Sequence, residues 1–230
     1  ILKHCSVVNA RRLETVEPGG VGRRFLERTQ PTLEAQLCNL ADEIAYNAHD
    51  IDDGVRSGLI TLEQLEAVEL FDRFRRQTLA EHPHLLGRRL LYEAIRRMLS
   101  AQVYDVIEAT SAALASAAPR SVDDVRMAAT LVGFSAPMRT QSSELKRFLF
   151  KNLYRHPQVV ETTGRAQRVV TELFAAYVAE PREMKPRFTR QAMEGEPPAR
   201  ARTVADYIAG MTDRFAGREH ERLTGLRLLG

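Results

Sequence analysis

The chain has 230 residues and a formal net charge of +3, and 44% of its residues are hydrophobic. That length is enough for one large domain, or for one domain with a subdomain. No apolar run approaches the ~20 residues of a membrane helix, and the small net charge gives little support for a polyanionic partner. The two cysteines provide neither a disulfide framework nor a metal-type pair. With no signal peptide at the start, these features predict a soluble, cytoplasmic protein without a membrane partner.

Apolar residues recur at helical spacing along the chain, and no alternating strand pattern is visible. The sequence therefore predicts an all-α fold of six or more helices. Residues 1–5 resemble the tail of a helix, from which we expect the chain to be a fragment of a longer protein. Residues 6–30 are expected to be a loop or short helical pieces. The first long helix is predicted to begin at the cap Thr32 and to close near Gly54.

Capping residues and helix breakers predict the later elements. Thr61 and Ser121 each begin a capping pattern. Residues 180–199 are expected to be the longest irregular stretch, with Thr203 capping the helix after it. The remaining helices are expected at about 85–116, 142–156 and 158–179, with a connection at 133–140.

The stretch from Pro31 to Gly54 carries a polar series along an otherwise apolar helix. Asp42, Tyr46 and Asp50 follow one another at steps of four residues, so they lie along one helix face over roughly 12 Å. A metal ion at one end of the series and a small polar ligand along the rest would suit that length.

Acidic residues on a helix are usually solvated, and this is the default interpretation for any one of these carboxylates. Asp42, however, is flanked by the apolar residues Ala41 and Ile44. A carboxylate beside a buried stripe needs a partner, and a cation is the commonest sufficient one. Cys38 lies in the apolar part of the same helix and is expected to be a buried thiol.

The predicted helix at 142–156 carries a second candidate set. Lys146 and Tyr154 are eight residues apart, and further basic residues follow on the neighbouring strip. Cations beside an acidic metal-binding helix would suit a triphosphate, because the metal and the cations together offset its charge. An ordinary amphipathic helix with a basic outer face explains the same spacing, and spacing alone favours that interpretation.

Three runs carry a resemblance to a known family: EAQLCNLADEIAYNAHDIDDG at 34–54, ELKRFLFKNLYRHPQV at 144–159 and VADYIAGMTDRFA at 204–216. In this order they resemble segments of the deoxyguanosine triphosphate triphosphohydrolase-like proteins, a branch of the HD-domain phosphohydrolases. The resemblance implies a multi-helix HD-domain-like bundle whose N-terminal part is missing. Residues 1–180 would be the C-terminal part of that domain, and residues 181–230 a helical tail packed on it.

The resemblance also implies a role for each candidate residue. The family holds its metal with an early His, a His-Asp doublet and a later Asp, and Asp42 matches the later Asp. Tyr46 and Asp50 match positions near the deoxyribose of the substrate. Lys146 resembles a basic phosphate contact, and Tyr154 a second aromatic on the sugar side. The implied cofactor is Mg²⁺ or Mn²⁺, and another transition metal remains open.

Several of the family's site residues have no counterpart in this chain. The early His, the doublet, and the catalytic His and acid that follow the doublet are absent. His49-Asp50 spells the same two letters, but it follows Asp42 on the later helix and is not the doublet. We therefore expect no catalytic residue, and no activity, in this chain alone. The reaction implied for the complete protein is removal of intact triphosphate from a deoxynucleoside triphosphate, by attack of water on the α-phosphorus.

Two other functions remain open from the sequence. One is an HD phosphohydrolase that acts on another phosphorylated substrate. The other is a non-catalytic helical module that binds a nucleotide or a nucleic acid. The partners implied by the resemblance are a dNTP substrate and further copies of the chain in a homo-oligomer. A single-stranded nucleic acid or a dNTP is a candidate effector.

Overall fold

A computed structural model describes residues 5–228, and this range is helical almost throughout. Twelve α-helices, one π-helical turn and one 3-10 turn occur there without any strand, which confirms the predicted all-α fold. No helix in the described range is both long enough and apolar enough to cross a bilayer. All but one residue of the predicted helix tail at 1–5 lies outside that range.

The chain divides into two compact units, residues 1–153 and residues 154–230. The boundary suggested by the sequence, at residue 180, falls inside the second unit. The physical reason is that the long helix ending at Ala179 packs against the helices that follow it rather than closing the preceding domain.

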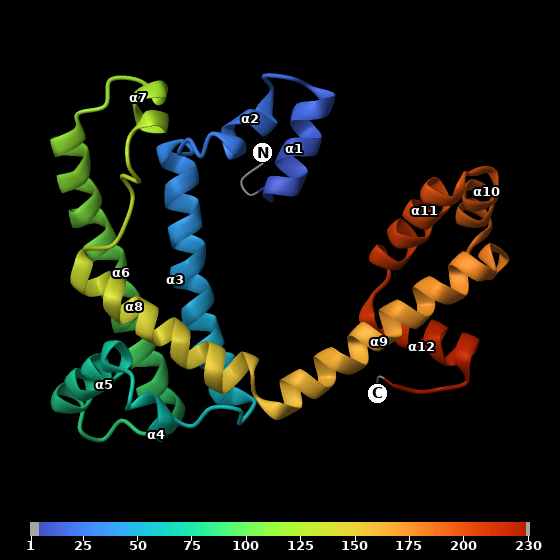
Figure 1. The fold of residues 1–230 in the computed structure, drawn as a ribbon. Helices are drawn as coiled ribbons and strands as arrows, with labels where there is room; N and C mark the ends of the chain where they lie inside the picture. Colours follow the sequence, from blue (N-terminus) through green and yellow to red (C-terminus); the bar gives the residue numbers. More distant parts are fainter. Residues whose placement is uncertain (1–4, 229–230) are drawn as a thin grey trace. The chain divides into compact units, whose positions relative to one another are not determined.

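The first unit holds eight of the α-helices, and its core lies between the longest of them (Figure 1). α3 packs beside α6, α8 packs on α3, and α5 packs on both α6 and α8. The helices are α1 (Val7–Val16), α2 (Val21–Leu26), α3 (Leu33–Arg56), α4 (Leu62–Leu65), α5 (Glu69–Glu81), α6 (Gly87–Ala117), α7 (Val122–Met127) and α8 (Ala136–Leu149). Fully buried side chains from four of these helices form the centre of the core: Ile51, Phe71, Met98 and Leu145.

The helix α3 begins and ends as its sequence predicts. The side chain of Thr32 accepts a hydrogen bond from the backbone N–H of Ala35, which satisfies one of the free donors at the helix start. Near the other end, the carbonyl of Gly54 accepts the backbone N–H groups of Leu59 and Ile60. A Cβ atom on Gly54 would lie 2.7 Å from Cδ1 of the buried Ile60, so any larger residue here would require that side chain to shift.

The two capping patterns predicted at Thr61 and Ser121 are both confirmed as complete capping boxes. The start predicted at residue 142 is wrong, because α8 already begins at Ala136. Ser135 caps α8. The backbone N–H and the hydroxyl of Ser135 both donate hydrogen bonds to the carboxylate of Asp105. Ser142 is instead a buried residue inside the helix.

The second unit is built from the four remaining α-helices. It contains α9 (Pro157–Ala179), the 3-10 turn η2 (Pro181–Glu183), α10 (Pro186–Glu194), α11 (Pro197–Ala209) and α12 (Asp213–Thr224). The irregular stretch expected at 180–199 is therefore wrong, and Thr203 is a buried residue inside α11 instead of a cap. The signal that was missed is the proline in the first turn of α10 and of α11, a position where the backbone needs no N–H donor.

Hydrogen bonds join α12 to α9 and to the segment that follows α12 in the second unit. His220 is fully buried, with Nδ1 at 3.0 Å from the carbonyl oxygen of Leu226 and Nε2 at 2.6 Å from Oε2 of Glu172. The buried Tyr177 donates its hydroxyl to Glu219 at 2.7 Å. Burial first, and then Glu219, raise the pKa of Tyr177, so its hydroxyl stays protonated and remains a donor.

Candidate functional site

The polar series predicted on α3 lies on the side of that helix that faces away from the core. Asp42 and Tyr46 are exposed, and Asp50 is half-buried. The opposite side carries Ile44 and Ile51, which are both buried in the core. Because all three polar residues belong to one regular helix, their spacing along it is fixed, at about 6 Å per step.

An ion pair brings Lys146 to the same helix. Nζ of Lys146, on α8, lies 2.7 Å from Oε2 of Glu43, the residue that directly follows Asp42 on α3. The side chain of Lys146 is 47% exposed, so its ammonium group still has room for another ligand. The structure therefore brings one cation of the predicted helix at 142–156 beside the acidic series, although the two stretches lie about a hundred residues apart.

Sequence reasoning did not single out Glu43 as part of this arrangement. The available signal was an acidic residue next to Asp42 and a lysine on another helix. Their pairing depends on how α3 and α8 pack against each other, which local spacing does not contain.

Tyr154, the remaining candidate, belongs to the second unit. It ends the π-helical turn Phe150–Tyr154, which directly follows α8, and its side chain is partly exposed. Turns of this kind occur often at functional sites, because the extra residue interrupts the regular helix. The role that the resemblance gives to Tyr154 stays a prediction.

The described residues do not make up a complete metal site. No group of three or more His, Cys, Asp or Glu residues in that range is arranged to hold a metal ion. Asp42 offers one exposed carboxylate, whereas Mg²⁺ and Mn²⁺ prefer six oxygen ligands in octahedral geometry. Cys38 is exposed and not buried as predicted, because it points away from the core on the same side of α3 as Asp42.

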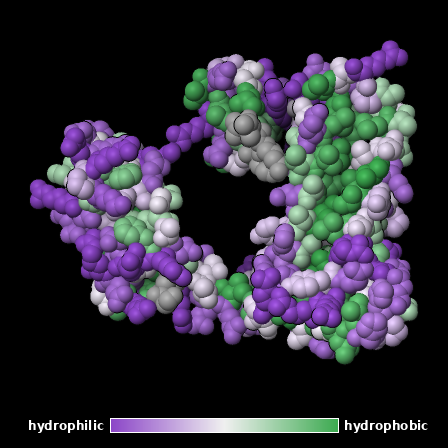
Figure 2. Space-filling model, turned by 180° about the vertical axis from the view of Figure 1, so that it is seen from behind, coloured by the Kyte–Doolittle hydropathy of each residue, from purple (hydrophilic) through white to green (hydrophobic). Residues whose placement is uncertain are grey.

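Apolar side chains are also exposed on α3 and α6, two helices that pack against each other. Leu37 of α3 and Val103 and Ile107 of α6 are among the exposed large hydrophobic residues. Figure 2, which views the molecule from behind, shows hydrophobic side chains gathered along the long helices of the first unit. The unit that carries the acidic series thus exposes an apolar surface that would favour contact with another apolar surface.

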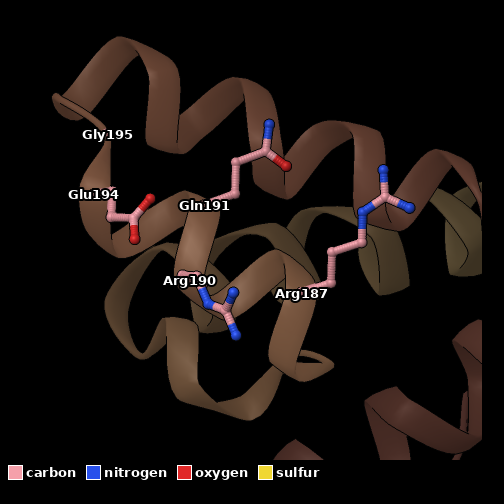
Figure 3. Close-up of a pocket in the computed structure, with 5 residues that line it drawn as sticks. All are labelled: Arg187, Arg190, Gln191, Glu194 and Gly195. Carbon is pink, nitrogen blue, oxygen red and sulfur yellow. The ribbon is translucent and has the colours of Figure 1, made fainter.

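A hollow of about 480 Å³ lies at α10 in the second unit, and Figure 3 shows the five residues that line it. Arg187 and Gln191 point to one side of α10, and Arg190 points to the other, so the two arginines do not converge on one point. No residue predicted for the site lines this hollow. A solvated basic helix face explains it without a ligand.

Comparison with known proteins adds a second line of argument. Residues 132–222 match a phosphohydrolase-associated domain. A deoxyguanosinetriphosphate triphosphohydrolase-like protein from Bordetella pertussis is 53% identical over 223 residues, which are 97% of this chain and 56% of that relative. The chain is homologous to the deoxyguanosinetriphosphate triphosphohydrolase-like proteins. The resemblance predicted from the three sequence runs is therefore confirmed.

Other deoxyguanosinetriphosphate triphosphohydrolase-like proteins agree with this result. The relative from Ralstonia nicotianae is 52% identical over 229 residues, which are 100% of this chain and 57% of the relative. The relative from Thiobacillus denitrificans is 47% identical over 224 residues, which are 97% of this chain and 57% of the relative. The chain spans about half the length of the curated relatives it matches, and the similarity covers both of its units.

Proposed function

We propose that this chain is part of a phosphohydrolase that cleaves deoxynucleoside triphosphates into deoxynucleoside and triphosphate. The match to a phosphohydrolase-associated domain and the names of the relatives support the reaction class. The observation that carries the proposal is the 2.7 Å ion pair between Lys146 and Glu43. It holds a cation against the helix that also carries Asp42 and Tyr46, and a cation, a carboxylate and a phenol are groups that suit a triphosphate joined to a sugar.

Each residue of this surface has a proposed task. Lys146 donates hydrogen bonds to phosphate oxygens and offsets part of their charge. Tyr46 and Asp50 face the sugar, where a carboxylate accepts a hydrogen bond from a hydroxyl group and the ring limits the space around the neighbouring carbon. Tyr154, which belongs to the second unit, is not counted in this surface, and its role as a second aromatic on the sugar side stays a prediction. The chain's own contribution is therefore to bind and orient the substrate.

The proposed cofactor is Mg²⁺ or Mn²⁺, with Asp42 as one of its ligands. Such an ion would supply Lewis-acid activation of the phosphate. The described residues provide no complete ligand set, and the resemblance assigns the other ligands to family residues that this chain does not contain. We propose that the remainder of a protein of the relatives' length supplies them, and that it packs on the exposed apolar residues of α3 and α6.

A product assay tests the proposal. A protein of the relatives' full length would be incubated with Mn²⁺ and each dNTP or NTP, and triphosphate would be separated from pyrophosphate and orthophosphate. We expect triphosphate and deoxynucleoside from dNTPs, with little turnover of NTPs. Release of pyrophosphate or orthophosphate, or equal turnover of NTPs, would favour a phosphohydrolase with another phosphorylated substrate.

A second candidate function is a non-catalytic helical module that binds a nucleotide. The incomplete set of metal ligands in the described range favours it. Binding of dNTP without any product, in the protein of full length, would support this module over the enzyme. The homo-oligomer and the nucleic-acid or dNTP effector stay predictions.

A further inference from the structure

The ion pair between Glu43 and Lys146 joins two helices that carry candidate site residues. Glu43 lies on α3 and Lys146 on α8, and their side chains are 30% and 47% exposed. The ion pair between Asp52 and Arg56 of α3, by contrast, stays within one helix. Glu43 therefore links α3 to α8, as the pair within α3 does not.

A lysine ammonium has three N–H donors on a flexible four-carbon stem. Glu43 accepts one of the donors of Lys146 and leaves the other two for oxygen atoms of a ligand. Without such a partner, an exposed lysine loses rotamer freedom when it meets its ligand, and this loss weakens binding. If a carboxylate already holds the ammonium group before the ligand binds, less rotamer freedom is lost on binding.

The position of Glu43 on α3 also sets where the cation lies. It follows Asp42 directly, so its side chain leaves the helix about 100° around the axis from that carboxylate. The ammonium of Lys146 is consequently held to one side of the acidic series instead of on top of it. This leaves Asp42 unpaired with Lys146 and separates the cation from the carboxylate that we assign to the metal.

We infer that Glu43 is a positioning residue, which holds Lys146 in place for the phosphates of the substrate. This inference rests on the proposed function. Two other roles of Glu43 make different predictions. If Glu43 only linked α3 to α8, its loss would change stability without a specific effect on KM. If Glu43 competed with phosphate for Lys146, its loss would lower KM.

Steady-state kinetics with dGTP, in the protein of the relatives' full length, separate these roles. We expect Glu43→Gln to raise KM by about two- to fivefold, the range given by partly exposed ion pairs, with little change in kcat. Lys146→Met is expected to raise KM by roughly 10- to 100-fold, since it removes a charge-assisted contact. Glu69→Gln is the matched control, because it removes one carboxylate from an exposed ion pair with Arg76 on α5. It should leave both constants unchanged.

A charge swap tests whether substrate binding needs the cation on α8 or only an ion pair between α3 and α8. The double variant with Glu43→Lys and Lys146→Glu keeps an ion pair between α3 and α8 but moves the cation to α3. We expect its melting temperature to return to that of the unaltered protein, and its KM to stay as high as that of Lys146→Met. A swap that restores KM would overturn the inference.

The single variants separate failure of the inference from failure of the proposed function. An unchanged or lowered KM for Glu43→Gln, together with a raised KM for Lys146→Met, would overturn the positioning role alone. An unchanged KM for Lys146→Met would overturn the phosphate role of Lys146, and the inference with it.

Discussion

The two units differ in how completely they satisfy their own side chains. In the second unit, His220 contacts Glu172 and the carbonyl of Leu226, and Tyr177 donates to Glu219, whereas Nδ1 of His156 is buried without a partner in the part of the chain that the structure describes. In the first unit, Gln102 is fully buried on α6, but neither polar atom of its amide has a hydrogen-bonding partner among the described residues. The first unit also exposes apolar side chains on α3 and α6 (Figure 2).

The pairing of buried polar side chains bears on which part of the chain gains from a partner outside it. Side chains that are paired within their own unit, such as His220 and Tyr177, need no such partner. A unit with an unpaired buried amide beside an exposed apolar surface is the kind that gains from a further partner. The candidate residues on α3 and α8 belong to the first unit.

The largest expected effect concerns the chemistry assigned to the first unit. Asp42→Ala, in the protein of the relatives' full length, should lower dNTP turnover by at least roughly 100-fold through loss of a metal ligand. Circular dichroism should show an unchanged helical fold, because Asp42 is exposed. Asp53→Ala, which removes another exposed carboxylate from α3, is the control and should keep full turnover. Turnover retained by Asp42→Ala would rule out the metal role.

The next largest effect concerns the polar closure of the second unit. His220→Ala should lower the free energy of unfolding by about 3 kcal/mol, since it leaves a cavity and removes the partners of Glu172 and Leu226. Urea unfolding of the chain would measure it. His49→Ala, on the exposed side of α3, should change the stability by less than about 0.5 kcal/mol. Equal effects of the two variants would contradict the contrast between the units.

A smaller effect tests whether the apolar surface of the first unit is covered in a longer protein. Ile107, which is 54% exposed, should tolerate Ile107→Ser in this chain within about 0.5 kcal/mol. In the protein of full length the same change should cost about 1–2 kcal/mol, because it would then place a hydroxyl in an apolar contact. Val170→Ser, at a position 49% exposed in the second unit, is the control and should behave alike at both lengths. A cost for Ile107→Ser that does not depend on length would argue against the proposed packing.

The smallest effect is a pH dependence in the second unit. Arg168 first, and then His220, hold the pKa of the Glu172 carboxyl below its usual value. A carboxyl whose folded pKa is depressed adds stability above its unfolded pKa, near 4.5, and this stability is lost as the pH falls through the folded pKa. The melting temperature should therefore fall less steeply for Glu172→Gln than for the unaltered chain as the pH falls below about 5. High salt should weaken the difference, and identical slopes would contradict the assignment.

Local signals in the sequence predicted local structure well. The caps at Thr32, Thr61 and Ser121 were predictable because a cap depends on a side chain and a backbone N–H only three residues away. The same reasoning failed at Thr203, which lies inside α11. There the helix starts earlier, at a proline that the sequence reading treated as a breaker instead of a first-turn residue.

Contacts between distant segments could not be predicted from the same signals. Cys38 is apolar and lies among apolar residues, yet it is exposed, since burial depends on which side of α3 the other helices cover. The pairing of Glu43 with Lys146 depends on the register between α3 and α8. Helical spacing singled out the candidate residues as sets that share one side of a helix, and the family resemblance then gave each of them a role.

The close approach at Gly54 has a mechanical consequence for the candidate site. Ile60 packs against the backbone of α3 where a side chain would otherwise stand, and the carbonyl of Gly54 holds the turn that follows. The last turns of the helix, next to Asp50, are thereby clamped to the next segment of the chain. Contacts of this kind oppose tilting or sliding of that end of the helix. We therefore expect discrimination between ligands along α3 to come from the lengths and shapes of its side chains, and changes of preference during evolution to appear there first.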